Sequence, residues 1–338
     1  MKKFNFKTVL GLLSVFSIAL FVSCSDDDSK GAGGKPTIES VSMAQNDSLV
    51  EQGTANTMYI IRGKGFTGTQ KIYFNETDTY FNGTMVTDNV ILVTIDRSTP
   101  YENANNELKV VTTGGTATYH FVVAPPAPDI TGFNPVNAAA GETVTVAGSY
   151  FLDPVVTFGT IPATVVSSTL TSIQVKVPEG AQGTYITVKT ISGKATSWEA
   201  VGSSIYDDNL IAGMTAGGWG VTTDLAATEN VSQGEKAIKV AIDSWSGFQL
   251  DNGPATGTST GIRFSIKADT AADIRMILNG DWTDSKQYKF VPSTSWTKVF
   301  IPWSAFGGKP ATVSSLVFGE NKGVKNVYYI DDIGLSYE

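Results

Sequence analysis

Short runs of alternating apolar and polar residues fill most of this chain from residue 36 onward. Glycine, asparagine, aspartate and proline separate these runs, and no stretch keeps the period of an amphipathic helix. Alternation with a period of two is typical of strands with one buried face. In the first two thirds of the chain the clearest predicted strands are 59–61, 71–74, 90–93, 107–111, 144–146 and 185–188. The pattern predicts an all-β protein assembled from several sandwiches.

An internal repeat organises the first part of the chain. The segment from Tyr59 to Phe66, with glycine at 63, returns as Val144 to Phe151, with glycine at 148. We expect the repeated glycine to allow a bend or a positive φ, and the phenylalanine after it to plug the end of a sandwich. The repeat predicts two related domains, at residues 36–124 and 125–202.

The second copy carries the motifs of a known family. It contains Phe133-Asn-Pro135, the run from Gly141 to Gly148, Val156-Thr-Phe158-Gly159 and Val175-Lys-Val-Pro178. Together these motifs resemble the IPT/TIG immunoglobulin-like domain over nearly the whole unit. The first copy lacks the proline-containing turn and is longer between Asp96 and Asn106, but we place it in the same family. In surface lipoproteins such domains resemble spacers.

The composition changes in the last part of the chain, residues 203–338, which contains five of the six tryptophans. Its predicted strands are 237–242, 248–250, 262–267, 274–278, 288–291, 298–301, 315–318 and 327–330. So many short strands suit a jelly-roll sandwich. The segments from Trp296 to Phe306 and from Tyr328 to Leu335 resemble the ending of galactose-binding-like carbohydrate-binding modules. This resemblance implies a carbohydrate-binding domain.

Candidate binding residues follow from the chemistry of sugar capture. Flat aromatic faces cover the apolar side of a pyranose, and planar polar groups bind its hydroxyls. If the apolar residues of 274–278 point inward, strand parity puts Arg275 and Asn279 on the outer face. Trp282 follows in a polar loop, where an indole ring is costly to expose without a function. The predicted glycan-binding residues are Trp219, Trp245, Arg275, Asn279, Trp282 and Tyr288, with Gln249 as a secondary candidate.

A packing role stays equally open for Trp219 and Trp245. Tyr288 either binds the glycan or simply covers the sheet. Trp296 is predicted to lie in the core, because it precedes an amphipathic strand.

Acidic residues near both ends of the last domain suggest a structural calcium ion. Related modules often carry one there, and hard cations favour clustered oxygen ligands. The predicted ligands are Asp207, Asp208, Glu235 and Asp332, with Asp331 beside them. Solvated carboxylates that merely end a strand are the alternative.

The first residues predict where the protein resides. A basic start and an apolar run from Val9 to Val22, too short to span a bilayer comfortably, predict a signal peptide over 1–23. Phe21-Val22-Ser23-Cys24 resembles the lipobox of bacterial lipoproteins, which implies that Cys24 is lipidated. The acidic linker within 24–35 looks like the signal that exports lipoproteins to the outer face of the outer membrane.

Charge and residue types disfavour two classes of function. The formal net charge is −8 and lysine and arginine do not cluster, which argues against nucleic-acid binding. The single histidine, His120, lies far in sequence from the tryptophans, so neither a catalytic triad nor a histidine metal site is supported. Two carboxylates suffice for a glycosidase, but a catalytic domain with a cleft is usually larger than this last domain.

The whole arrangement resembles surface glycan-binding lipoproteins encoded beside starch-utilisation-type outer-membrane transporters. The resemblance implies non-catalytic capture of a polysaccharide at the cell surface, without a catalytic cofactor and with such a transporter complex as partner. The lipid alone would contact the membrane. A neutral β-glucan is favoured, because a charged uronan would need more than one outward arginine. An adhesin or structural stalk is the alternative, and a glycoside hydrolase is less favoured.

Overall fold

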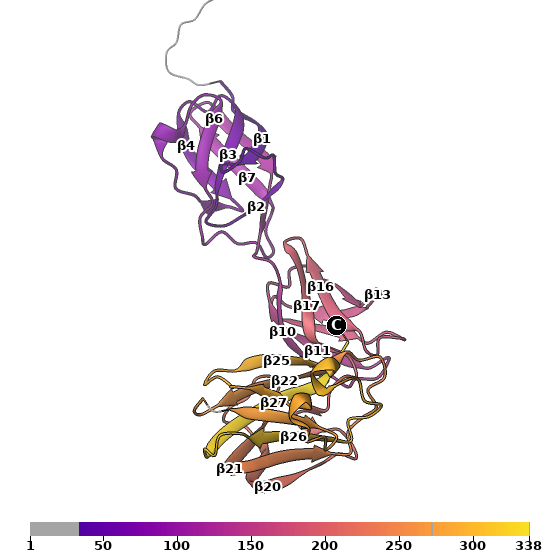
Figure 1. The fold of residues 1–338 in the computed structure, drawn as a ribbon. Coiled ribbons are helices and arrows are strands. Elements are labelled where there is room, and N and C mark those ends of the chain that lie inside the picture. The colour runs from indigo at the N-terminus through magenta and orange to yellow at the C-terminus, as the bar shows by residue number, and fades with distance from the viewer. Residues whose placement is uncertain (1–33, 272, 338) are drawn as a thin grey trace, which may run out of the picture. The chain divides into compact units, whose positions relative to one another are not determined.

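The computed structural model describes residues 34–271 and 273–337 of the chain. The predicted signal peptide and Cys24 lie outside the described residues. In the described part, no helical segment has both the length and the hydrophobicity that crossing a bilayer requires. The strands form two compact units, one ending at Val123 and one beginning at Ala124 (Figure 1). The predicted all-β class is confirmed.

Unit 1 is an antiparallel sandwich built from β1 (Thr37–Met43), β2 (Gln52–Thr54), β3 (Met58–Lys64), β4 (Thr69–Phe74), β5 (Thr77–Asp78), the 3₁₀ helix η1 (Gly83–Met85), β6 (Val90–Thr94), β7 (Glu107–Thr112), β8 (Gly115–His120) and β9 (Val122–Ala124). One sheet has the order β1-β3-β6 and the other β5-β4-β7-β8. Alternate residues such as Ile61 on β3 and Ile72 on β4 are fully buried in one core between the sheets. The alternating pattern therefore marks the buried faces correctly.

The first half of unit 2 is a second sandwich, formed by β10 (Asp129–Asn134), β11 (Thr143–Ser149), β12 (Val155–Phe158), β13 (Ile161–Pro162), β14 (Val165–Ser168), β15 (Ser172–Lys176), β16 (Tyr185–Thr190) and β17 (Gly193–Ala200). Its sheets have the orders β10-β11-β15-β14 and β13-β12-β16-β17. Apart from β14, each strand occupies the place of a strand in the two sheets of unit 1. The sequence repeat is therefore also a repeat of topology.

Glycine is required at the two repeated positions because a neighbouring strand backbone lies too close for a side chain, and not because of the backbone conformation of the glycine itself. A Cβ at Gly63 would lie 1.9 Å from a carbonyl oxygen of β1, and one at Gly148 would lie 2.0 Å from a carbonyl oxygen of β10. Neither glycine has a positive φ, so that part of the prediction is wrong. Phe66 and Phe151 are buried in their cores, as predicted.

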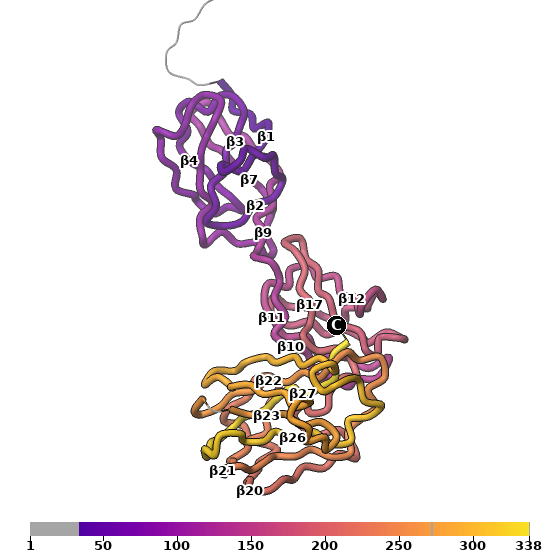
Figure 2. Tube along the Cα trace, in the orientation of Figure 1, coloured from indigo at the N-terminus to yellow at the C-terminus, as the bar shows by residue number. Residues whose placement is uncertain are grey.

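The last sandwich contains β18 (Tyr206–Asp207), β19 (Asn209–Leu210), β20 (Thr215–Ala227), β21 (Ala237–Asp251), β22 (Gly261–Ala268), β23 (Ile274–Leu278), the 3₁₀ helix η2 (Asp284–Lys286), β24 (Tyr288–Phe290), β25 (Thr297–Pro302), the 3₁₀ helix η3 (Trp303–Phe306), β26 (Ser315–Glu320) and β27 (Asn326–Ser336). The order is β24-β23-β26-β21-β27-β22-β25. β20 pairs with β21, beside which it lies in Figure 2. The first part of β21 pairs with β27 and its last part with β26. This change of partner lets one set of strands enclose a single core, as the predicted jelly roll requires.

A buried ion pair joins the two halves of unit 2. Arg263 on β22 and Glu199 on β17 are each 1% exposed, and Nη1 of the arginine lies 3.6 Å from Oε1 of the glutamate. The guanidinium also donates to the carbonyl of Asp332 at 2.7 Å and to the hydroxyl of Ser203 at 3.0 Å. The domains predicted at 125–202 and 203–338 are therefore packed into one compact unit.

Candidate functional site

One row of paired residues crosses the outer face of the last sandwich. From strand to strand it contains Trp219 on β20, Gly247 on β21, Gly319 on β26, Arg275 on β23 and Lys289 on β24. Phe248 and Phe318, the sequence neighbours of the two glycines, point into the core, so the row faces outward. The glycines have no side chains, and both are buried, because the Trp219 ring lies over Gly247 and the Arg275 side chain lies over Gly319.

Trp282 reaches this row from the loop after β23. Its ring centroid lies 5.8 Å from that of Trp219, with the two planes inclined at 54°. The guanidinium carbon of Arg275 lies 5.4 Å from the centre of a Trp282 ring, a cation–π contact. Trp282 and Trp219 are 47% and 40% exposed. Three predicted residues from separate strands and loops thus form one cluster, which we call the indole cluster: Trp219, Arg275 and Trp282.

Hydrogen bonds within the loop hold Trp282 in place. The carboxylate of Asp281 accepts the backbone N–H of Thr283 at 3.1 Å and pairs with Lys286 at 2.8 Å. Hydrogen bonds from Lys286 and then Thr283 lower the pKa of Asp281 to about 2, so the carboxylate is charged at neutral pH. The side-chain amide of Gln287 donates to the carbonyl of Trp282 at 2.6 Å. Hydrogen bonds of residues before and after Trp282 therefore fix the conformation of the loop.

The position of Trp219 depends on the backbone of Gly247. A Cβ added at Gly247 would lie 2.5 Å from its ring, so the indole lies directly against this glycine. In the next row of the same face, Ile277 and Val317 are paired and are only 0% and 2% exposed, although they lie outside the core cluster. The outer face is therefore covered at these residues as well as at the two glycines of the row.

Trp245 lies next to the indole cluster. It is 60% exposed, and its carbonyl accepts the indole N–H of Trp219 at 3.1 Å. Trp303, by contrast, is 3% exposed and belongs to the core. Trp296 is partly exposed, and its predicted place in the core is wrong.

The structure does not bring Asn279 and Tyr288 into the indole cluster. Both ends of the Asn279 amide bind backbone groups, the carbonyl of Thr312 at 2.7 Å and the N–H of Ser315 at 3.2 Å. Tyr288 pairs with Met276, whose side chain points into the core, so this ring lies on the opposite face from Arg275. Tyr288 thus covers the core side of the sheet, which was the alternative to a binding role.

Three of the four predicted calcium ligands, Asp207, Asp208 and Asp332, accept hydrogen bonds from the protein. Asp208 accepts the backbone N–H groups of Glu235 and Lys236, and Asp207 accepts that of Val136. The hydroxyl of Ser265 donates to Asp332. Across the described residues, no three acidic, histidine or cysteine side chains are grouped to hold a metal ion. The residues therefore do not fit the ion in this arrangement, and calcium binding stays a prediction.

The buried Asp331 and Asp332 pair predicts a fall in stability as the pH rises. Burial, and next the charge of Asp332, raise the pKa of Asp331 to about 8, and burial also raises the pKa of Asp332. A raised pKa means that the folded protein holds a proton which the unfolded chain loses near pH 4. Between about pH 4 and 8 the free energy of unfolding should then fall, by up to about 1.4 kcal/mol per pH unit for one such carboxyl.

Thermal melts from pH 5 to 8, followed by tryptophan fluorescence, test this expectation. Asp332→Asn should flatten the decline, because it removes the neighbouring charge. Asp284→Asn, at an exposed carboxylate of the same domain, is the control and should not. A stability that rises over this pH range would contradict the assignment.

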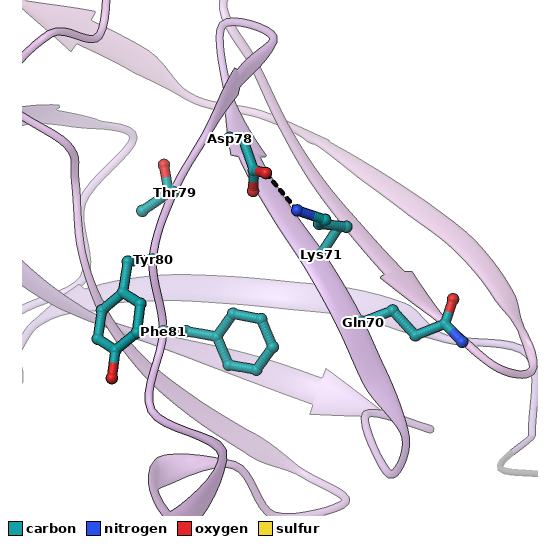
Figure 3. A pocket seen from close by; sticks show the side chains of 6 residues that line it. All are labelled: Gln70, Lys71, Asp78, Thr79, Tyr80 and Phe81. Atoms are coloured by element: carbon teal, nitrogen blue, oxygen red, sulfur yellow. Dashed lines mark hydrogen bonds and ion pairs between the residues drawn. The ribbon is translucent and has the colours of Figure 1, made fainter.

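Unit 1 carries a hollow of about 320 Å³, which Figure 3 shows with the side chains that line it: Gln70, Lys71, Asp78, Thr79, Tyr80 and Phe81. Tyr80 is 83% exposed there. Lys71 and Asp78 are paired with each other. This hollow offers one strongly exposed ring, whereas the indole cluster combines two indoles with a guanidinium. The indole cluster is therefore the better candidate for sugar binding.

The role of Gly247 and Gly319, and the strand pairing that makes them neighbours, were not predicted from the sequence. Gly247 and Gly319 are separated by a long stretch of chain, and nothing in either local sequence indicates that they become neighbours. A glycine at an outward position of a predicted strand is the only available signal.

Part of the chain is similar to a known domain family. The IPT/TIG domain model matches residues 128–203. A curated relative from Bacteroides ovatus, described as an IPT/TIG domain-containing protein, is 32% identical over 152 residues, which cover 43% of this chain and 30% of the relative. The chain thus corresponds to less than a third of the length of that relative.

The chain is also similar to solved structures. The surface glycan-binding protein PbSGBP-B from Prevotella bryantii matches with a TM-score of 0.50 and 19% identity, over 90% of this chain and 99% of that one. SGBP-B from a complex xyloglucan utilization locus in Bacteroides uniformis matches with a TM-score of 0.37 and 16% identity, over 89% and 99%. Residues 128–203 therefore match the IPT/TIG domain model, and most of the chain shares the fold of the Prevotella bryantii surface glycan-binding protein.

Proposed function

We propose that this protein binds a polysaccharide at the cell surface without cleaving it. The observation that carries the proposal is the indole cluster, in which two partly exposed rings and one guanidinium meet on the outer face of the sheet. Indole faces suit the apolar side of a pyranose, and the guanidinium suits its hydroxyls. Arg275 is partly exposed, although its Nε atom is buried and has no hydrogen-bond partner among the described residues.

The charges around the indole cluster favour a neutral glycan. Lys286 and Lys289 are paired with Asp281 and Asp284, and Arg275 forms no ion pair with any described residue. A polyanionic chain would need several unpaired cations. A neutral β-glucan is the proposed ligand, in line with the name of the Prevotella bryantii protein, which describes it as glycan-binding.

The remaining parts of the proposal concern location and partners. Lipidation at Cys24 would tether the protein to the outer face of the outer membrane, where the two immunoglobulin-like domains act as spacers. An outer-membrane transporter complex would receive the captured glycan. An adhesin or stalk is the competing function, and a glycoside hydrolase is the less favoured one.

Affinity electrophoresis in gels that contain soluble polysaccharides separates these functions. We expect a neutral β-glucan to retard the full chain while the polysaccharide stays intact. Release of reducing ends would support the hydrolase instead. Unchanged mobility with every neutral and acidic polysaccharide would reject glycan capture and favour the adhesin or stalk.

A further inference from the structure

Trp245 has a backbone conformation that its surroundings must hold in place. Its φ is 58°, in the left-handed region that bulky residues rarely adopt. It lies in the short stretch of β21 between the part that pairs with β27 and the part that pairs with β26. A strand that changes partner leaves backbone groups there without ladder bonds, so other groups must satisfy them.

Glu320, the last residue of β26, accepts the backbone N–H of Trp245 in this stretch. The residue is fully buried, and Oε2 of its carboxylate accepts the N–H of Trp245 and that of Gly323, each at 2.8 Å. Oε1 accepts the N–H of Lys322. No basic side chain among the described residues pairs with Glu320, so backbone N–H groups balance its charge. Burial acts to raise the pKa of Glu320, but these bonds, that of Trp245 first, hold it below its ordinary value.

Further contacts link the Glu320 carboxylate to the rings of Trp245 and Trp219. Gly323 lies against the Trp245 ring, since a Cβ there would be 2.8 Å from the indole nitrogen. The hydroxyl of Ser244 donates to the Gly323 carbonyl at 3.0 Å and closes the two loops on each other. The Trp245 carbonyl in turn accepts the indole N–H of Trp219. A chain of contacts therefore runs from Glu320 through the Trp245 backbone to the indole cluster.

We infer that Glu320 is a positioning residue for glycan binding, which holds the rings of Trp245 and Trp219 in their bound orientation before the ligand arrives. The inference rests on the proposed function, because it gives the anchored rings a ligand. Rings fixed in advance lose less conformational entropy on binding, and the affinity rises accordingly. A charged carboxylate suits this role because it accepts several N–H groups at once and is strongly held by them.

Glu320→Gln tests the inference, because the amide keeps the shape but presents an NH₂ group to backbone donors. We expect the dissociation constant for the retarding glucan to rise about tenfold, the effect of losing a hydrogen bond to a charged group. We also expect faster hydrogen exchange at the indole N–H of Trp219, read by NMR. The indole N–H of Trp303, which donates to Ser259, should exchange as before and serves as the internal control.

Ser244→Ala supplies a second variant if Glu320→Gln does not fold, because it removes only the hydroxyl that closes the two loops on each other. Binding should weaken and exchange at the Trp219 indole should rise, and wild-type values of both would overturn the inference. Wild-type affinity in Glu320→Gln would overturn the inference, and so would equally accelerated exchange at Trp303. If the wild-type chain binds no polysaccharide, the proposed function fails, whereas the exchange measurement still shows whether Glu320 orders the indoles.

Discussion

Replacing Arg263 by alanine should destabilise unit 2 by about 3 to 5 kcal/mol, because it leaves a buried acid without its partner. Glu199 is 1% exposed, and burial already raises its pKa, opposed by the charge of Arg263. The substitution also removes the bonds to Ser203 and to the Asp332 carbonyl. Urea unfolding followed by tryptophan fluorescence measures the effect in unit 2 alone, since no tryptophan precedes Trp198.

Two further variants make this result interpretable. The combination of Arg263→Met with Glu199→Gln should recover much of the loss, because a buried ion pair can often be replaced by uncharged groups of similar volume. Lys325→Ala breaks the exposed pair with Asp243 and should leave the unfolding curve unchanged. If Arg263→Ala behaves like Lys325→Ala, the buried pair does not join the two halves of unit 2.

Replacing Trp282 by alanine should weaken binding of the retarding glucan by about 2 kcal/mol, roughly 30-fold in Kd, as expected for an aromatic residue at the centre of a binding site. The variant loses one ring face and the cation–π contact that orients Arg275. Stability should change little, because the side chain is 47% exposed and belongs to no core cluster. Isothermal titration calorimetry and a thermal melt on the same sample separate the two effects.

Tyr80→Ala is the matched control for this experiment. Its ring is 83% exposed, but it lines the hollow of unit 1 (Figure 3), whereas the strands of the indole cluster belong to unit 2. Binding should be unaffected. Unchanged affinity of Trp282→Ala would remove this residue from the site, and a loss seen only with Tyr80→Ala would move the site to unit 1.

The location of most strands follows from the sequence, because alternation is a local property. The strand predicted at 274–278 has those limits in the structure, and the one predicted at 262–267 is one residue longer at each end. β20 was missed because most of its residues are exposed and the chain there is rich in glycine and threonine. Its backbone pairing with β21 holds it in the sheet, and pairing with a distant segment leaves no local pattern.

The sequence by itself determined that the chain is all-β, that its first part repeats and that its tryptophans concentrate in the last domain. Only the tertiary structure decided which of these rings meet. Arg275 and Trp282 join Trp219 because β23, β26, β21 and β20 align in register, whereas Tyr288 falls on the opposite face of the same sheet. The physical reason is that strand order and register depend on long-range pairing, whereas burial of alternate side chains depends on the residues of one strand alone.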